Sequence, residues 1–425
     1  MLDPRVIRER PEAVRAAAKL KRIDFDVDAA LEVDQRRRAL IHAVEQAKAE
    51  QKRRGKALGA LDAAAREAEK AALAGLKSEI AAREVELEEL ERRWQALLLR
   101  APNLPAPEVP AGASDQDNVE LKRVGSPPAP DFPLLDHEEL GRRLRIIDVE
   151  RGVRISGARF YVLRGAGALL HRATLAFALD HMVRKGFEPM EVPLLVRDPA
   201  MVGTAYFPGG EEQAYRIEKD ELNLVGTAEV PLTSFHAGEI LEERQLPIRL
   251  VAQSSCFRRE AGAGGKDTRG LYRIHQFQKV EQVVILPADE EASREWHQRI
   301  LANAEEVLAA LGLPYRVVNV CGGDLGQPQV QKFDIETWMP SRNGYGETHS
   351  ASRFHDFQAR RLELRYRDAA GELRFCHTLN NTVIASPRIL IPILELYQQK
   401  DGSVVVPTVL RPWLGGREVL EPKTR

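Results

Sequence analysis

The chain has 425 residues, more than one average domain holds, so we expect two domains of unequal size. Its 62 Lys and Arg residues nearly balance 63 Asp and Glu residues, which excludes a basic surface spread over the whole molecule and leaves only local basic clusters for a nucleic acid. The cysteines (Cys256, Cys321 and Cys376) are far apart, no run is apolar enough to span a membrane, and no signal peptide opens the chain, so we expect a cytoplasmic protein with no structural zinc, disulfide scaffold or membrane partner.

Residues 28–100 have the composition of long helices, with almost no Pro, little Gly and many Ala, Leu, Glu, Lys and Arg residues. Two mostly apolar seams step alternately by three and four positions, the spacing that keeps one stripe of a helix against a partner helix. Gly55 and Gly59 weaken the helix between the seams, so the pattern predicts an antiparallel two-helix coiled-coil arm, about 45 Å long, that turns near residues 59–66. The first seam comprises Val33, Arg37, Leu40, Val44, Ala47, Gln51, Arg54 and Leu58, and the second comprises Leu73, Leu76, Ile80, Arg83, Leu87, Leu90, Trp94 and Leu97.

Basic residues gather near the expected tip of this arm, where the first seam becomes polar. A charge run of this kind usually marks a solvated helix face. A two-helix hairpin buries little apolar area, however, so it is expected to project from the protein and not to form a compact domain. A projecting basic tip is a candidate surface for the phosphates of a nucleic acid. The residues concerned are Lys48, Lys52, Arg53, Arg54 and Lys56.

The sequence pattern changes after the arm. Residues 101–110 are rich in Pro and are expected to form a stiff, extended linker. Beyond about residue 130, short β-branched runs and helical segments are separated by Gly and Pro, which is typical of an α+β or mixed α/β fold. Residues 174–185 are predicted as a helix that ends at Gly186, and residues 187–196 as the strand that follows it.

The most informative segment, residues 256–282, has the pattern of a strand, a Gly-rich loop and a second strand. Side chains alternate along a strand, so Arg258 and Glu260 are expected on one face of the first strand. One face of the second strand carries charged and aromatic residues, which suit a protein core poorly because buried charges need partners or ligands. We interpret this face as a binding platform. Its residues are Arg273, His275, Phe277, Lys279 and Glu281.

Four segments of the chain resemble motifs of one known family. Residues 256–282 resemble motif 2 of the class II aminoacyl-tRNA synthetases, a strand-loop-strand unit with an Arg-x-Glu pair, in the form found in the bacterial seryl-tRNA synthetase family. Residues 226–230 resemble the serine-site loop of that family, and the helix-strand unit closed by Pro193 resembles motif 1, its dimer interface. Residues 378–399 resemble motif 3, a strand and helix with one essential arginine. Together with the arm, the resemblance covers essentially the whole chain.

This resemblance implies an α+β fold in which an antiparallel sheet flanked by helices forms a class II catalytic domain at residues 111–425. Residues 1–110 would form a tRNA-binding domain that includes the coiled-coil arm. The implied enzyme is a serine-tRNA ligase, which uses ATP and Mg²⁺ to convert L-serine to seryl-adenylate and transfers the seryl group to the 3′ end of serine tRNA. A homodimer is implied as well, with an arm that contacts the long variable arm of the tRNA. Whether selenocysteine tRNA is a second substrate stays open.

The resemblance also assigns roles to single residues. Arg258 and Arg388 would be the catalytic arginines, and Arg258 would hold the α-phosphate and the serine carboxylate in line, because a planar guanidinium can bind two oxyanions. Glu347 and Ser350 would bind Mg²⁺, which prefers oxygen ligands. Serine would contact Thr227, Ala228, Glu229, Arg258, Glu281, Asn380 and Thr382. ATP would contact Arg258, Arg259, Glu260, Arg273, Ile274, Phe277, Glu347, Thr348, His349, Ser350 and Arg388.

Some of the ATP contacts can be stated more closely from the resemblance. Glu260 would accept a hydrogen bond from the adenine amino group, and Phe277 would stack under the adenine ring. Arg388 would lie on the other face of that ring or near the γ-phosphate. Arg273 would bind the γ-phosphate of a bent ATP, whereas strand alternation directs Arg259 away from the site.

Motif 3 departs from the commonest form of the family, because residues 380–383 read Asn-Asn-Thr-Val where many relatives have Asn-Gly-Ser-Gly. We take Thr382 as the hydroxyl-bearing replacement. The loop at residues 266–269 would face the tRNA acceptor end. Lys279 shares the platform face but is expected to be only a structural neighbour, since an ionised carboxylate attacks without a general base.

Two other functions are left open by the sequence. The first is a paralogue that retains the fold but loads serine onto a carrier protein, or that only binds tRNA. The retained arginines and carboxylates argue against lost catalysis, and the retained arm argues against a carrier protein as acceptor. The second is a coiled-coil structural protein with a globular end, which would not explain the charged strand face.

Overall fold

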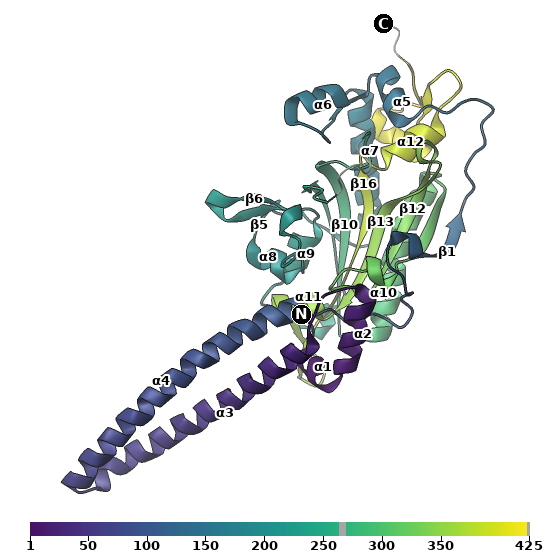
Figure 1. Ribbon diagram of the computed structural model, residues 1–425. Coiled ribbons are helices and arrows are strands. Elements are labelled where there is room, and N and C mark those ends of the chain that lie inside the picture. The colour runs from purple at the N-terminus through teal and green to yellow at the C-terminus, as the bar shows by residue number, and fades with distance from the viewer. Residues whose placement is uncertain (263–268, 423–425) are drawn as a thin grey trace. The chain divides into compact units, whose positions relative to one another are not determined.

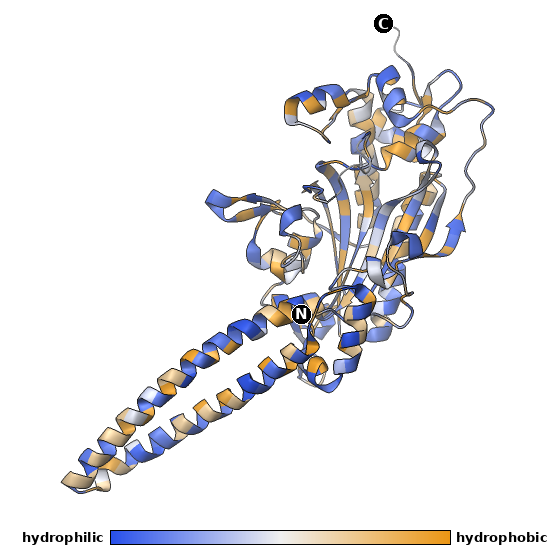
Figure 2. Cartoon of the chain, in the orientation of Figure 1, coloured by the Kyte–Doolittle hydropathy of each residue, from blue (hydrophilic) through white to orange (hydrophobic). Residues whose placement is uncertain are grey.

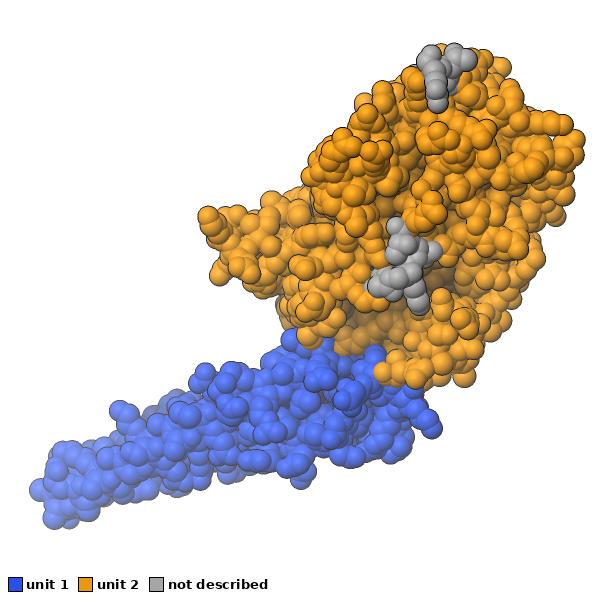
Figure 3. All heavy atoms as spheres, turned by 45° about the horizontal axis from the view of Figure 1, so that its top comes forward, with its two compact units in different colours: residues 1–19, 23–102 blue, residues 20–22, 103–425 orange. Residues whose placement is uncertain are grey.

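The structure is a computed structural model that describes residues 1–262 and 269–422 (Figure 1). It contains two compact units, one of residues 1–19 and 23–102 and one of residues 20–22 and 103–425 (Figure 3). Among the described residues, no helix combines the length and the hydropathy that a membrane crossing requires.

The first unit is helical and is dominated by one long hairpin. Its two arms, α3 (Val27–Ala57) and α4 (Ala63–Arg100), are joined by the short 3-10 helix Leu58–Ala60, which confirms the predicted coiled-coil arm. The turn is tighter than expected, because Asp62 caps α4 by accepting a hydrogen bond from the Ala65 amide at 2.8 Å and so starts the helix at Ala63. Two shorter helices, α1 (Pro4–Glu9) and α2 (Pro11–Lys21), precede the hairpin.

The predicted seam positions are all buried or half-buried, but Ala30, Asp34 and Leu98, which lie outside the seams, are buried as well; apolar and polar residues alternate along both helices (Figure 2). Val44, Ile80 and Trp94 are buried between the helices. A polar seam position nearer the tip is accommodated by an ion pair between the helices, since the Arg54 guanidinium binds the Glu69 carboxylate at 2.6 and 3.0 Å. The heptad pattern therefore predicted a shielded stripe on each helix but missed the buried residues Ala30, Asp34 and Leu98.

The second unit is built on an eight-stranded sheet in the order β1-β11-β12-β13-β16-β10-β9-β4. All neighbours in this sheet are antiparallel except the β4–β9 pair. The strands are β1 (Val119–Val124), β4 (Glu188–Pro189), β9 (Ile248–Phe257), β10 (Gln276–Leu286), β11 (Tyr315–Asn319), β12 (Gln331–Met339), β13 (Gly344–His355) and β16 (His377–Ser386).

Helices α7 (Ala166–Arg184) and α10 (Glu290–Ala310) cover one face of this sheet. Alternate residues of β10 and β16, such as Val284 and Leu379, join the apolar core beneath these helices. Since side chains alternate along a strand, the residues between them point to the opposite face. That opposite face carries the candidate site.

The helix predicted at residues 174–185 is the second half of α7, and Gly186 follows it with a φ of +80°, a conformation that favours glycine. The strand predicted at residues 187–196 is wrong in extent. Only the two-residue β4 and the short β5 (Leu195–Arg197) form there, because prolines in the segment have no N–H group for a ladder.

Smaller elements complete the second unit. The helices are α5 (His137–Leu144), α6 (Val149–Ser156), α8 (Asp198–Gly203), α9 (Glu229–Ser234), α11 (Phe357–Leu362) and α12 (Leu390–Tyr397). The strands are β2 (Ile147–Asp148), β3 (Val162–Leu163), β6 (Tyr215–Ile217), β7 (Leu222–Leu224), β8 (Ile240–Glu242), β14 (Arg365–Arg367), β15 (Leu373–Phe375), β17 (Val404–Val405) and β18 (Val419–Leu420).

Candidate active site

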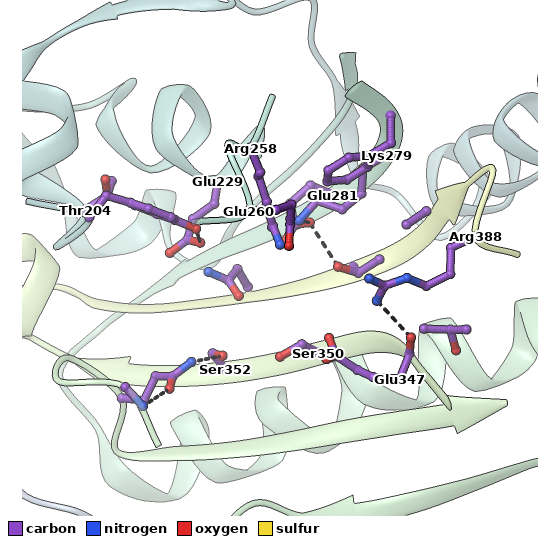
Figure 4. A pocket seen from close by; sticks show the side chains of 18 of the residues that line it. Thr204, Glu229, Arg258, Glu260, Lys279, Glu281, Glu347, Ser350, Ser352 and Arg388 are labelled. Atoms are coloured by element: carbon purple, nitrogen blue, oxygen red, sulfur yellow. Dashed lines mark hydrogen bonds and ion pairs between the residues drawn. The ribbon is translucent and has the colours of Figure 1, made fainter. Parts of the chain in front are cut away.

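A cavity of about 330 Å³ lies on the face of the large sheet opposite α7 and α10, over β10, β13 and β16 (Figure 4). Several charged side chains line this cavity, as expected of the predicted binding platform. Most of the residues assigned to serine, ATP and Mg²⁺ line this one cavity. They are Glu229, Arg258, Glu260, Ile274, Phe277, Glu281, Glu347, Thr348, Ser350, Asn380, Thr382 and Arg388.

Five of the predicted site residues lie outside this lining. Thr227 is buried and its hydroxyl accepts from the Glu229 amide at 3.1 Å, and Ala228 is part of the apolar core. The Arg259 guanidinium lies over the Tyr215 ring, outside the cavity lining. His349 is buried between the Thr348 hydroxyl and a backbone carbonyl. The fifth is Arg273, which binds the lining residue Glu260.

The expected alternation of Arg258 and Glu260 along the first strand is wrong, although both residues line the cavity. Strand β9 ends at Phe257, and Glu260 has a left-handed φ of +52°. Arg258 is fixed instead by a hydrogen bond from its Nε to the Gly226 carbonyl oxygen at 3.2 Å. Its guanidinium lies 5.3 Å from the centre of the Phe277 ring, so a cation–π contact also orients it.

The second strand follows the prediction only in part. Phe277, Lys279 and Glu281 alternate along β10 and face the cavity. Arg273 and His275 precede the strand, which begins at Gln276, so the alternation does not reach them. Residues 266–268 of the loop between the two strands lie outside the described residues.

Two buried carboxylates, Glu229 and Glu281, line the cavity, and Figure 4 shows Glu229 toward the end away from Arg388 and Glu281 nearer the middle. Tyr206 Oη and Gln358 Nε2 donate to the two oxygens of Glu229 at 2.8 and 2.9 Å. Burial, followed by the negative charge of Glu281, raises the pKa of Glu229 to about 7. The Glu281 carboxylate binds the Lys279 ammonium at 2.5 Å. An enclosed pair of carboxylates with one internal cation suits the binding of a second cation, such as an ammonium group.

A β-bulge shapes the other end of the cavity. Residues three apart on a regular strand lie on opposite faces, so Glu347 and Ser350 could not both face the cavity from an unbroken β13. The register between β12 and β13 shifts at this point: His349 pairs with Ile335, but Glu347 pairs with Glu336. Thr348 is the additional residue, and it brings Glu347 and Ser350 to the same face.

Positive charges surround Glu347. Partial loss of water acts to raise the pKa of Glu347, but the charges of Arg388 and Lys332 outweigh it, and the pKa lies below its ordinary value. Glu347 is therefore ionised. Arg388 lies over the Tyr272 ring at 4.3 Å from its centre, and its Nη1 donates to the Glu347 carbonyl oxygen at 2.9 Å. This end of the cavity suits phosphate groups, with a carboxylate and a hydroxyl placed for a bound cation.

Within the described ranges, no group of three or more His, Cys, Asp or Glu side chains is arranged to hold a metal ion. Glu347 and Ser350 would thus supply only part of the coordination of Mg²⁺. This arrangement fits the ion, because Mg²⁺ in nucleotide sites uses one or two protein ligands together with phosphate oxygens and water.

Sequence reasoning missed several residues of the lining. Tyr206, which donates to Glu229, and Gln329, which donates to Ser352 at 2.8 Å, come from loops far from the motifs. No periodicity links these loops to the platform, so the sequence alone carried no signal for them. Lys279, predicted to be only a structural neighbour, lines the cavity and is paired with Glu281.

Comparison with known proteins identifies this arrangement. Residues 214–397 match the tRNA synthetase class II core domain (G, H, P, S and T), so the fold and the cavity define a class II aminoacyl-tRNA synthetase. Residues 1–105 match the seryl-tRNA synthetase N-terminal domain. The chain is 48% identical to the serine–tRNA ligase of Deinococcus radiodurans over 425 residues, which cover all of both proteins. The chain belongs to the seryl-tRNA synthetase family, as the sequence motifs predicted.

Two solved structures show the same fold. The seryl-tRNA synthetase from Pyrococcus horikoshii complexed with ATP is 36% identical and superposes with a TM-score of 0.94, covering 100% of each chain. The cytoplasmic serine–tRNA ligase from Naegleria fowleri in complex with AMP is 32% identical, with a TM-score of 0.89, and covers 100% of this chain and 99% of its own. The predicted fold class is confirmed, and the activity is that of the family, the ATP-dependent ligation of serine to tRNA. The alternative of a structural coiled-coil protein is wrong.

Proposed function

We propose that the cavity activates L-serine at the end formed by Glu229 and Glu281 and binds ATP at the end formed by Glu347 and Arg388. The observation that carries this proposal is the position of Arg258, which lies between Glu229 on one side and Glu347 and Arg388 on the other in one continuous cavity (Figure 4). A guanidinium in this position can bind the serine carboxylate and the α-phosphate at once and hold them for reaction.

In the first step, a carboxylate oxygen of serine attacks the α-phosphorus of ATP. A new O–P bond forms, the bond to the β-phosphate oxygen breaks, and pyrophosphate leaves with the electron pair. No general base is needed because the carboxylate is already ionised. The guanidinium of Arg258 offsets the negative charge that builds up on the α-phosphate in the transition state. In the second step, a hydroxyl of the tRNA 3′ terminus attacks the acyl carbon of seryl-adenylate, and AMP leaves.

We assign the recognition of serine to a set of polar groups at one end of the cavity. The ammonium group of serine would bind between Glu229 and Glu281, whose charges attract it. Asn380 and Thr382 lie on the same strand face and would contact the hydroxyl. A site that pairs with this hydroxyl disfavours alanine, because its own buried polar groups would be left without partners, while threonine has to be excluded by its extra methyl group.

We assign Mg²⁺ to Glu347 and Ser350, which would hold it against the phosphates of ATP. The ion would supply positive charge that offsets the charge of the leaving pyrophosphate. The Glu347→Gln substitution should raise the Mg²⁺ concentration that gives half-maximal pyrophosphate exchange. The Glu336→Gln variant is a matched control, because Glu336 pairs with Glu347 across the strands and binds Arg316 outside the cavity. Equal Mg²⁺ requirements for both variants would refute the assignment.

We also propose that residues 1–110 bind the long variable arm of serine tRNA through the arm tip and that residues 111–425 carry out catalysis. Lys52 and Lys56 support this role best, because both are exposed near the turn. Lys48 and Arg53 are also exposed but bind Glu84 and Glu50. Arg54, included in the predicted tip, is partly buried in the seam with Glu69, so its main role there is to join the helices.

A homodimer is proposed from the motif 1 resemblance. Support comes from apolar side chains that a partner could cover, including Leu169 on α7, which is 42% exposed, and Leu121 on the edge strand β1, which is 53% exposed. Sedimentation at several protein concentrations tests this, and a monomer throughout would refute it. The cytoplasmic location and the use of selenocysteine tRNA stay predictions.

The experiment that tests the proposed site compares wild type with Arg258→Ala and Arg258→Lys. Serine-dependent ATP–pyrophosphate exchange should fall by roughly 10²–10³-fold in Arg258→Ala, since the group that offsets transition-state charge is lost. The Arg258→Lys variant should remain strongly impaired, because an ammonium cannot bind two oxyanions in a planar fork. Near wild-type exchange by the Ala variant would overturn the proposal. Wild type that forms adenylate but charges no serine tRNA would favour the paralogue with another acceptor.

A further inference from the structure

The loop of residues 326–329 forms part of the cavity wall. The Gln329 side chain donates from Nε2 to Ser352 Oγ at 2.8 Å. Ser352 lies at the same end of the cavity as Glu229 and away from Arg388 (Figure 4). The loop therefore borders the end of the cavity to which we assign serine.

Two residues far away in the sequence bind every carbonyl oxygen of this loop. The Lys21 ammonium donates to three of them, at 3.2, 2.9 and 2.6 Å. The Asn103 side chain donates to the fourth, the Pro328 carbonyl oxygen, at 2.9 Å. The backbone N–H of Asn103 donates to the Gln327 carbonyl oxygen, which Lys21 also binds, at 3.0 Å. Lys21 and Asn103 are only 3% and 5% exposed. The three acceptors of Lys21 are Gly326, Gln327 and Gln329.

The geometry around Lys21 matches an ammonium group. An ammonium has three N–H donors and meets three carbonyl acceptors, whereas a neutral amine would direct its lone pair at one of them. Burial lowers the pKa of Lys21 well below its ordinary value, but the three acceptors favour the charged form. Without this donor the Gln329 carbonyl oxygen would lose its partner, and those of Gly326 and Gln327 would keep one backbone N–H each, so the loop would be held less firmly.

We propose that Lys21 and Asn103 are positioning residues of the serine subsite, which fix the loop 326–329 so that Gln329 holds Ser352 and the adjoining cavity wall in place. This inference rests on the proposed function, because it assumes that serine binds at the Glu229 end. Lys21 and Asn103 lie outside the cavity lining. Lys21 acts through the loop, whereas Asn103 also donates from its side chain to the carbonyl oxygen of the lining residue Phe354 at 2.8 Å.

The test is the Lys21→Met substitution in the full-length enzyme, measured by ATP–pyrophosphate exchange. Met retains most of the length of the side chain but removes the donors. We expect the KM for serine to rise by about tenfold while the KM for ATP changes by less than about twofold, because the loop borders only one end of the cavity. The matched control is Arg22→Met, which removes a neighbouring cation that is exposed and donates to the Ala113 carbonyl oxygen. This control should leave both KM values unchanged.

A purely structural role predicts a different pattern. Loss of folded protein lowers the concentration of active sites, which titration by adenylate formation measures, but leaves the KM for serine unchanged in the remaining sites. If Lys21→Met is recovered unfolded, a second variant, Asn103→Leu, tests the same role. It removes the side-chain donors of Asn103 and should raise the KM for serine by about threefold. Wild-type KM values in both variants would overturn the positioning role. Wild type without serine-dependent exchange would overturn the proposed function and, with it, this inference.

Discussion

Glu229 is a buried carboxylate that we assign to serine, and its surroundings change its pKa. Its two oxygens already accept from Tyr206 and Gln358, and burial beside Glu281 raises its pKa to about 7. It is therefore protonated below about pH 7 and ionised above it in the free enzyme. A bound ammonium group favours the ionised form, so serine binding and the ionisation of Glu229 promote each other.

This linkage predicts a pH dependence of serine binding. The KM for serine should rise as the pH falls below about 7, because Glu229 then has to lose a proton before the ammonium can bind. The Glu229→Gln variant should have a KM roughly tenfold higher at pH 8 and should lose this acidic rise. Exchange measured from pH 6 to 8.5 at saturating ATP checks both points.

A matched control for this prediction is Glu305→Gln. Glu305 is also a mostly buried carboxylate, but it binds Tyr315 and Lys122 on the far side of the unit. Its substitution should leave the pH dependence of the serine KM unchanged. An acidic rise that persists in Glu229→Gln would mean that another group titrates.

At the scale of elements, the success of the sequence analysis depended on whether a pattern was local. The heptad seams of α3 and α4 identified a shielded stripe on each helix, because such a stripe depends on the spacing along a continuous helix, although they missed the buried residues Asp34 and Leu98. The alternation of Phe277 and Glu281 succeeded inside β10 for the same reason. It failed for Arg258, which lies beyond the end of β9.

Other parts of the site depend on pairing between distant segments, which a single sequence does not reveal. The bulge at Thr348 depends on the register between β12 and β13. The sequence does not reveal this register, so only the family resemblance placed Glu347 and Ser350 together. The same holds for Tyr206 and Gln329, which reach the cavity from loops positioned by the whole sheet.

The arm yields a prediction of its own. Replacing Lys52 and Lys56 with Ala should weaken binding of serine tRNA and lower the slope of log K against log salt by about 1.5, because each cation that contacts a phosphate contributes roughly 0.7–0.9. Fluorescence titrations at several salt concentrations measure this slope. The Arg92→Ala/Arg93→Ala variant removes two exposed cations from the opposite end of α4 and should retain the wild-type slope.

A different outcome is expected for Arg54, which binds Glu69 across the seam. The Arg54→Met variant should keep most of the tRNA affinity, since the side chain is already engaged by a carboxylate, and should change mainly the helix content near the tip. If Arg54→Met lowers the salt slope as much as the double Lys variant, the ion pair with Glu69 does not account for the role of Arg54, and Arg54 contacts the tRNA directly.

At the scale of the molecule, the two compact units do not divide the chain at a single point. Residues 20–22 belong with the second unit although the first unit precedes and follows them. A truncation that removes residues 1–102 to delete the arm would therefore also remove Lys21 and disturb the cavity wall. The arm has to be shortened from within instead.

We predict that deleting residues 45–82 and joining Val44 to Arg83 through a short Gly-rich linker separates the two steps of the reaction. The junction suits the hairpin register, because Arg83 already contacts the Ala43 carbonyl oxygen across the helices. Serine-dependent exchange should stay within about threefold of wild type, while charging of serine tRNA should fall by at least about 100-fold as the phosphate contacts are lost. Loss of exchange in this variant, with the fold intact by circular dichroism, would contradict the independence of the two functions.

The position of Lys21 also bears on how such a protein can change over generations. An exchange of the whole N-terminal segment with a distant relative would bring in a foreign residue at this position together with the new arm. Unless that residue still bound the same loop, the recombinant would gain a tRNA specificity and lose affinity for its amino acid in a single event. The helices between residues 23 and 102 do not contact this loop through Lys21, so the short stretch around Lys21 would have to stay with the catalytic unit in such an exchange.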